Sequence, residues 1–328
     1  MKYKYLILLI TVIINLSFAK DNSKPIKQKN ATATLYASEG NKEIALDTLV
    51  SKLPSIGYSV VKSNKNIQEF YYKKFKEKNV EMISFFGITD DKVMRPLLLQ
   101  NPNFGAYAPF NLLAYKTLDI GKDDNTWYGH LNANTMLDIM DIQDTKQRDS
   151  FHKMVTNLDT LVKKEMKPTH SKVFTRSNKI FKDGLIKMVM KFKKPEDLEE
   201  FIEDFISEHD TKFSQNNFII AGFKDFKFDY DDQDLDFDKY DAYWISMLCH
   251  FKFSNSIFNR GKPEAGMFAP CTIYFYIPKG KNELHVGYAS VKNWITSLKF
   301  TDTKRIKYMK SIDNQVVEIF KELGFTKE

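Results

Sequence analysis

Hydrophobic and polar positions along this 328-residue chain follow strand and helix periods in turn. Alternating or short continuous apolar runs predict strands, and apolar residues three and four positions apart predict helices. The predicted strands are residues 31–38, 58–61, 80–88, 110–116, 126–131, 185–192, 218–223, 243–253, 271–277 and 284–289. The predicted helices are residues 41–53, 66–75, 91–100, 151–166, 195–209 and 305–323. Because strands and helices mingle without a strict strand–helix–strand rhythm, the pattern favours an α+β fold.

One sequence motif occurs twice within this pattern. Pro-x-x-Gly-x-aromatic-Ala-Pro spans residues 102–109 and returns at residues 263–270, an offset of 161 (263 − 102). Each copy runs directly into an apolar, strand-like segment. A long match at one spacing, in the same local context, indicates that the chain holds two versions of one folding unit.

The first residues have the pattern of an export signal. Lys2 and Lys4 precede an apolar run at residues 6–16, and Ser17-Phe18-Ala19 fits a small-x-small cleavage site. We therefore expect residues 1–19 to be a cleaved Sec-type signal peptide and the protein to be periplasmic. An uncleaved N-terminal anchor is the alternative. No later segment of the sequence predicts a membrane span.

The domain boundaries follow from the repeat and from changes in composition. We expect a disordered N-terminal segment at residues 20–34, although the first predicted strand overlaps the end of this segment. The first domain is predicted at residues 35–167 and the second at residues 182–328. Residues 168–181 are polar and without clear periodicity, which is typical of a linker.

The charge of the chain excludes one class of partner. The formal net charge is +7, and it becomes +5 without the two lysines of residues 1–19 (7 − 2). The lysines are spread among acidic residues, whereas nucleic-acid binding needs a clustered basic patch. We therefore expect no nucleic-acid partner.

The motifs resemble those of the DUF302 domain. The relevant residues are Ile83-Ser84-Phe85-Phe86-Gly87, Asn101-Pro102, Gly105, Ala108-Pro109, Ala269-Pro270-Cys271, Val286-Gly287-Tyr288 and Asn293-Trp294. The resemblance covers roughly residues 35–165 and 182–325, so the chain looks like a tandem DUF302 protein. It implies a TATA-box-binding-protein-like fold, with two repeated domains that each pack a curved, mostly antiparallel sheet on helices. The Pro-Cys pair of the family occurs only in the second copy. The resemblance does not imply any particular reaction.

The repeated motif has two interpretations. Proline fixes the backbone angle φ, and glycine turns where other residues are strained, so the motif is typical of a loop that sets the direction of a strand. A loop on a rigid scaffold also often contacts a ligand. The candidate residues are Pro102, Gly105, Pro109, Pro263, Gly266, Pro270 and Cys271.

The two cysteines are candidates for a disulfide. Cys249 and Cys271 both lie in the second half, and oxidising compartments favour pairing. A disulfide here would stabilise the fold by about 3 kcal/mol in the chain-entropy model. If their strands are neighbours in register, the two sulfur atoms meet. The alternatives are two free buried thiols or a ligand site.

Metal binding has weaker support in the sequence. Cys249, His250 and Cys271, with His285 as a further candidate, are residue types that suit zinc or copper(I). Neighbours on a strand point to opposite faces, so Cys249 and His250 do not readily share a metal. The eight aspartates of residues 225–241 lack the glycine and glutamate of an EF-hand and are interpreted as a solvated loop. We expect no metal and no cofactor.

No catalytic motif stands out. The chain has no Gly-x-Ser-x-Gly, no His-Glu-x-x-His and no glycine-rich phosphate loop. The leading hypothesis is an exported, non-enzymatic binding or interaction protein whose partner is a small apolar ligand or an envelope protein. The alternative is a periplasmic redox or metal-handling protein that uses Cys249 and Cys271. We expect a monomer, because the two repeats can pair within one chain.

Overall fold

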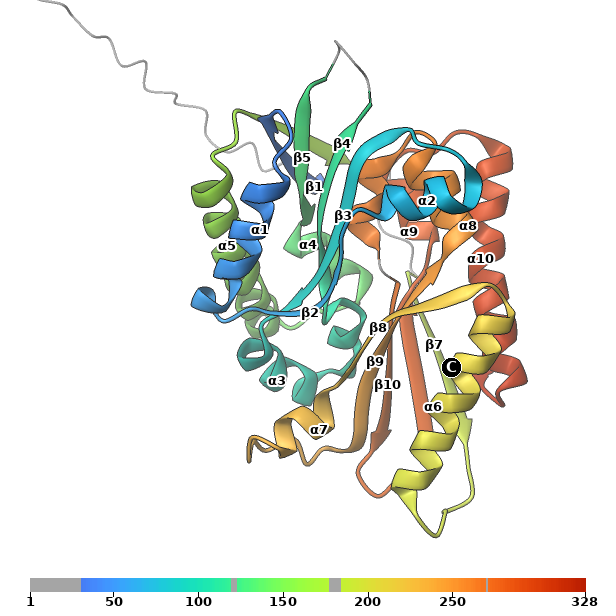
Figure 1. Ribbon diagram of the computed structural model, residues 1–328. Coiled ribbons are helices and arrows are strands. Elements are labelled where there is room, and N and C mark those ends of the chain that lie inside the picture. Colours follow the sequence, from blue (N-terminus) through green and yellow to red (C-terminus); the bar gives the residue numbers. More distant parts are fainter. Residues whose placement is uncertain (1–30, 119–122, 177–183, 270) are drawn as a thin grey trace, which may run out of the picture.

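The computed structural model describes residues 31–118, 123–176, 184–269 and 271–328 (Figure 1). The strands of the first half are β1 (Ala31–Glu39), β2 (Ser59–Asn64), β3 (Val80–Thr89), β4 (Phe110–Thr117), β5 (Asn125–Leu131) and β6 (His170–Thr175). Those of the second half are β7 (Leu185–Lys191), β8 (Phe218–Asp225), β9 (Tyr240–His250), β10 (Cys271–Pro278), β11 (Glu283–Ala289) and β12 (Thr326–Lys327).

Helices alternate with these strands in both halves. The first half has α1 (Glu43–Lys52), α2 (Ile67–Phe75), α3 (Asp91–Gln100), α4 (Ala133–Ile139) and α5 (Thr145–Met166). The second has α6 (Leu198–Gln215), α7 (Phe226–Asp231), α8 (Phe251–Ser254), α9 (Lys292–Ser297) and α10 (Thr303–Glu322). Short 3₁₀ helices are η1 (Leu53–Ile56), η2 (Pro102–Tyr107) and η4 (Pro263–Phe268), and a π-helical turn, η3, spans Asn255–Asn259.

The two halves share one sheet topology. Within the described residues, the first sheet has the strand order β2-β3-β4-β5-β1-β6 and the second has β8-β9-β10-β11-β7-β12. Counting strands from the start of each half, the two orders are the same. The ladders in both sheets are antiparallel. The predicted α+β class, with two repeated sheet-and-helix units, is therefore confirmed.

The sheets lie between two outer layers of helices. Figure 1 shows α1 and α5 on one side of the molecule, and α6 and α10 on the other. As a result, neighbouring residues of β10 contact opposite layers. The Phe275 ring faces the outer helices, with its centroid 5.8 Å from that of Phe205 in α6. The Tyr274 hydroxyl reaches the first half, 2.9 Å from the Asn103 side-chain oxygen. Because both faces are covered, the central strands are nearly continuously apolar.

Aspartates at the N-termini fix where the long helices begin. The Asp144, Asp197 and Asp302 side chains accept hydrogen bonds from backbone N–H groups in the first turns of α5, α6 and α10. These N–H groups have no partner within the helix, so a capping carboxylate stabilises the start. The apolar stripes predicted from the sequence then face the sheets, as with buried Phe151 and Leu158 in α5.

Several predicted boundaries need correction. The proposed linker at residues 168–181 contains strand β6, which pairs with β1 at the edge of the first sheet. Strand β1 begins at Ala31, inside the segment assigned to disorder. The acidic run at residues 225–241 includes helix α7, capped by Asp225. The strand predicted to reach residue 253 ends at His250. The predicted signal peptide at residues 1–19 lies outside the described residues.

Candidate functional site

The repeated motif joins the two halves. Its copies form η2 and η4, and each packs against the sheet of the opposite half. A Cβ on Gly105 would lie 2.5 Å from Tyr274 Cβ and also overlap the Tyr243 hydroxyl. A Cβ on Gly266 would lie 2.8 Å from both Leu113 Cδ1 and Phe85 Cε1. Both glycines are therefore required for close approach between the halves.

Hydrogen bonds at this joint are also reciprocal. Asn111 Nδ2 donates to the Gly266 carbonyl at 2.6 Å, and Thr272 Oγ1, 161 residues later (272 − 111), donates to the Pro109 carbonyl at 3.2 Å. The Tyr243 hydroxyl donates to the Pro102 carbonyl at 2.6 Å. The motif residues thus contact the opposite half, as the structural interpretation of the motif requires. Pro263 is buried in η4, and Pro270 lies outside the described residues.

The edge strands β2 and β8 also meet, and a cavity of about 290 Å³ lies beside this contact. It is enclosed by the carboxyl end of β2, helix α2, the amino end of β8, the carboxyl end of β9 and the segment that follows β9. Figure 1 shows α2 of the first half next to α8 of the second. Apolar residues from both halves line the cavity, including Phe70, Phe85, Ile219, Leu248, Phe251 and Phe258.

Two of these apolar side chains are accessible to solvent. Phe70 is 54% exposed and Ile219 is 48% exposed. The cavity therefore opens to the surface past an aromatic ring of α2 and an aliphatic side chain of β8. Exposed apolar groups at the entrance to an apolar cavity are typical of a ligand site.

Both cysteines line this cavity, but they do not form a disulfide. Cys249 and Cys271 are free thiols. Strands β9 and β10 are indeed neighbours, but Cys271 lies opposite Leu248, one residue away from Cys249. Neighbours on a strand point to opposite faces, so this register separates the two sulfur atoms. The structure therefore does not show the candidate Cys249–Cys271 disulfide, and both cysteines are free thiols in it.

The cavity keeps its thiols protonated. Burial raises the pKa of Cys271 to about 12, and the nearby Cys249 and Asp313 add to the shift. Burial also raises the pKa of Cys249, although Ser254 opposes this through a hydrogen bond, with Sγ and Oγ 3.7 Å apart. The thiolate is the form that attacks disulfides and binds metals, so these cysteines are suited to apolar packing.

His250 is the histidine of this cavity. Its Nδ1 accepts a hydrogen bond from the Phe253 backbone N–H at 3.2 Å, which places the proton of the neutral ring on Nε2. Burial lowers its pKa, and the positive charges of Lys252 and Lys74 lower it further. The ring is therefore neutral at physiological pH.

The structure separates the fourth metal candidate from this group. His285 lies in β11 opposite Tyr276, toward the far end of β10 from Cys271. Its Nδ1 is 2.6 Å from the Glu328 carboxylate, and its ring stacks on Tyr276. In the described parts of the chain, no three His, Cys, Asp or Glu side chains are grouped to hold a metal ion.

A second cleft, of about 440 Å³, lies on the other side of the β2–β8 contact. It is lined by the amino end of β2 and the carboxyl end of β8, so exchanging the two halves exchanges the two sites. Its chemistry differs, because Lys224 forms ion pairs with Asp91, at 3.2 Å, and with Asp229. The duplication thus produced one apolar site and one ion-paired site.

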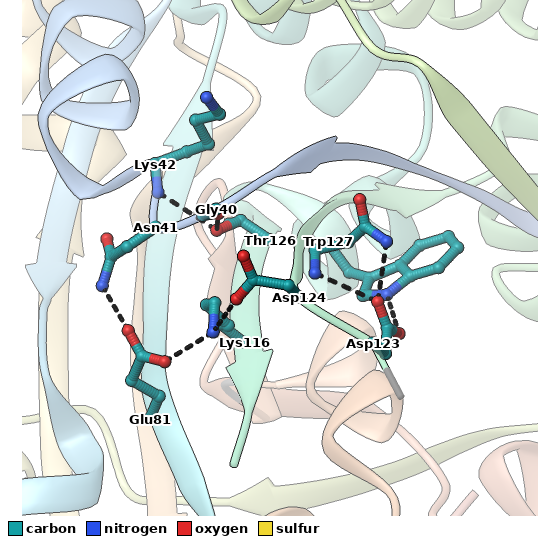
Figure 2. Close-up of polar contacts among 10 residues, drawn as sticks. Gly40, Asn41, Lys42, Glu81, Lys116, Asp123, Asp124, Thr126 and Trp127 are labelled. Atoms are coloured by element: carbon teal, nitrogen blue, oxygen red, sulfur yellow. Dashed lines mark hydrogen bonds and ion pairs between the residues drawn. The ribbon is translucent and has the colours of Figure 1, made fainter. Parts of the chain in front are cut away.

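A polar network in the first half has a structural role (Figure 2). Lys116 is nearly buried, and its ammonium group lies 2.6 Å from Glu81 and 2.9 Å from Asp124. The Thr126 hydroxyl donates to the Gly40 carbonyl at 2.6 Å and accepts from the Lys42 N–H at 3.1 Å. These contacts tie the turn between β1 and α1 to strands β3, β4 and β5.

Sequence reasoning found only part of the cavity. It named Cys249, His250 and Cys271, but missed Phe70 and Ile219. Phe70 lies on the outer side of a predicted amphipathic helix, and an exposed aromatic residue there was the one available signal. Nothing in the sequence indicated that α2 and β8, from different repeats, line one cavity.

Comparisons with known proteins add little. No protein-family model matches the chain, and no curated protein does. One similar solved structure is titled "Crystal structure of uncharacterized conserved protein DUF302 from Bacillus stearothermophilus". It is 14% identical, covers 40% of this chain and 97% of its own length, and has a TM-score of 0.34. None of the helices in the described residues is long and apolar enough to cross a membrane.

Proposed function

We propose that this chain is an exported, non-enzymatic protein that binds a small apolar molecule in the cavity between its two halves. The observation that carries this proposal is the apolar lining drawn from both halves, with Phe70 and Ile219 exposed at the entrance. A volume of about 290 Å³ is close to the lower end of the roughly 300–1,000 Å³ typical of ligand pockets. The ligand is therefore small or a single slender chain.

In this proposal the chain is a tandem pair of DUF302-like domains. The support is the repeated motif and the matching strand order of the two sheets. The two motif copies occupy reciprocal places, which lets one chain form the contact that two identical domains would otherwise form. We therefore also propose that the protein is a monomer, which the molar mass in light scattering tests.

The proposal that the protein is exported rests on the sequence pattern of residues 1–19. Its test is the mass of the protein recovered from the periplasm of a bacterial host. A chain that begins at Lys20 supports the proposal, and a full-length chain in the membrane fraction contradicts it.

The geometry favours ligand binding over redox or metal handling. A reactive thiol needs a lowered pKa, and both thiol pKa values are raised by burial. Cys271 pairs in register with Leu248 and not with Cys249, so the two free thiols also lack the direct cross-strand approach that a disulfide needs.

Binding is tested with N-phenyl-1-naphthylamine, a neutral dye that fluoresces in apolar surroundings. We expect saturable fluorescence with one dye per chain, because the ion-paired cleft does not offer an apolar site. Ile219→Asp places a charge at the cavity entrance and should weaken dye binding at least tenfold. Phe223→Asp is the matched control, since Phe223 is 45% exposed on the same strand but lines the second cleft.

The outcomes separate the alternatives. Equal dye binding by both variants and the unmodified protein would contradict the proposed cavity site. Loss of dye binding in Phe223→Asp alone would show that the dye binds in the second cleft. A thermal unfolding curve for each variant shows that the fold is intact.

A further inference from the structure

Basic side chains surround the cavity entrance. Lys62 lines the cavity from β2. From α2, the Lys73 ammonium group lies 5.8 Å from the centre of the Phe70 ring, and that of Lys74 lies 5.4 Å from the centre of the Phe251 ring. Both rings line the cavity. Lys252 follows Phe251 in α8, and its charge acts on His250.

These four lysines are not neutralised by acidic groups. Lys62, Lys73, Lys74 and Lys252 are exposed, and none has an ion pair within the described residues. No aspartate or glutamate is among the residues that line the cavity. The nearest acidic residue of α2, Glu69, is paired with Lys78 at 3.1 Å. The entrance therefore carries uncompensated positive charge next to an apolar interior.

The second cleft shows that this is not a general property of the fold. There, Lys224 is held between Asp91 and Asp229, and Asp225 also lines the cleft. The two sites occupy equivalent places in the duplicated structure. One has paired charges, and the other combines an apolar cavity with unpaired lysines.

We infer that the cavity binds a single-chain amphiphile with an anionic head group, such as a medium-chain alkyl carboxylate. The alkyl chain lies in the apolar cavity, and the head group lies at the entrance near Lys62. This inference rests on the proposed function and adds the chemistry of the ligand to it. The small volume admits one chain, so a two-chain phospholipid does not fit inside.

Three probes with the same ten-carbon chain test the head group: decanoate, decan-1-ol and decyltrimethylammonium. Each displaces the neutral dye from the cavity, below its micelle concentration. We expect decanoate to compete about fivefold better than decan-1-ol, since one charge contact near a protein surface contributes on this scale. Decyltrimethylammonium should compete worst. The advantage of decanoate should shrink in high salt, because salt screens exposed charges.

A charge-reversed variant assigns the effect to the entrance. Lys62→Glu should abolish the preference for decanoate over decan-1-ol and favour decyltrimethylammonium, each measured relative to the dye affinity of the same variant. The matched control is Lys172→Glu, because Lys172 is an exposed lysine on β6, the opposite edge strand of the same sheet. That variant should keep the preference of the unmodified protein. Far-ultraviolet circular dichroism verifies the fold of both variants.

Failure of the inference is distinguishable from failure of the proposed function. If the dye binds but the three probes compete equally, the anionic preference is overturned and an apolar site remains. If the dye does not bind at all, the proposed function itself fails. A final experiment measures binding of the protein to vesicles that contain phosphatidylglycerol. Sedimentation of the protein with them, without displacement of the dye, would assign the lysines to a membrane surface and overturn the inference.

Discussion

At the scale of single residues, two glycines decide how closely the halves approach. Gly105 and Gly266 occupy equivalent motif positions, and each faces side chains of the opposite sheet. Neither has a positive φ, so their role is close packing and not an unusual backbone conformation. An added methyl group at either position has no free space to enter.

We therefore predict that Gly105→Ala lowers the free energy of unfolding by about 1–3 kcal/mol, as expected for overpacking. Urea denaturation followed by circular dichroism measures the change. Gly280→Ala is a control at a site where an added Cβ meets nothing within 4 Å, although its φ of +68° carries its own cost of about 1 kcal/mol. A Gly105→Ala variant as stable as the unmodified protein would contradict the prediction.

At the scale of elements, an ion pair between buried His130 and partly exposed Asp159 links β5 to α5. His130 Nε2 lies 3.4 Å from the Asp159 carboxylate, and His130 Nδ1 lies 2.8 Å from the Leu131 carbonyl. Burial and the positive charge of Lys163 would lower the pKa of His130. The Asp159 carboxylate and the Leu131 carbonyl outweigh both, so the pKa is raised. The charge of His130 in turn helps to hold the pKa of Asp159 below its ordinary value, against the effect of burial.

The pair predicts a pH dependence of stability. The His130 contribution is complete below its unfolded pKa of about 6.5 and is lost as pH rises through the raised folded value. The Asp159 contribution is present above about pH 4 and is lost as pH falls through the lowered value. Asp159→Asn should therefore destabilise the protein more at about pH 5.5 than at about pH 8.5. Thermal unfolding at both values measures this, and an equal loss at the two would contradict it.

At the scale of the whole molecule, the two repeats share one hydrophobic core. Buried residues of both halves form a single cluster, in which η2 lies against β10 and η4 against β4. Separating the halves would expose Tyr243 and Tyr274, which are nearly inaccessible in the intact chain. Neither half is therefore complete without the other.

We predict that the two halves unfold in one cooperative transition. Variants that retain only Trp127, in β5, or only Trp244, in β9, report on each half separately. Their fluorescence midpoints in urea should coincide, because loss of one half removes the packing of the other. Two midpoints separated by more than the experimental error would show that the halves are independent domains.

Much of the fold was predictable from the sequence because it depends on local pattern. Residues 80–88 and 305–323 carry clear strand and helix periods, and β3 and α10 follow them closely. Strand β6 was missed because the exposed edge position of residues 170–175 leaves them without an apolar pattern. Helix α7 was missed because its aspartates obscured Phe226 and Tyr230, which are its buried face.

By itself, the sequence determined the duplication, the α+β class and the position of the two motif copies, since repeats and periodicity are properties of neighbouring residues. Only the tertiary structure decided the register of β9 and β10, which keeps Cys249 and Cys271 apart. It alone also brought residues of α2 and β8 together around one cavity. Contacts between distant segments depend on how complete sheets and helices pack. No local sequence pattern specifies which surfaces of the two halves come into contact.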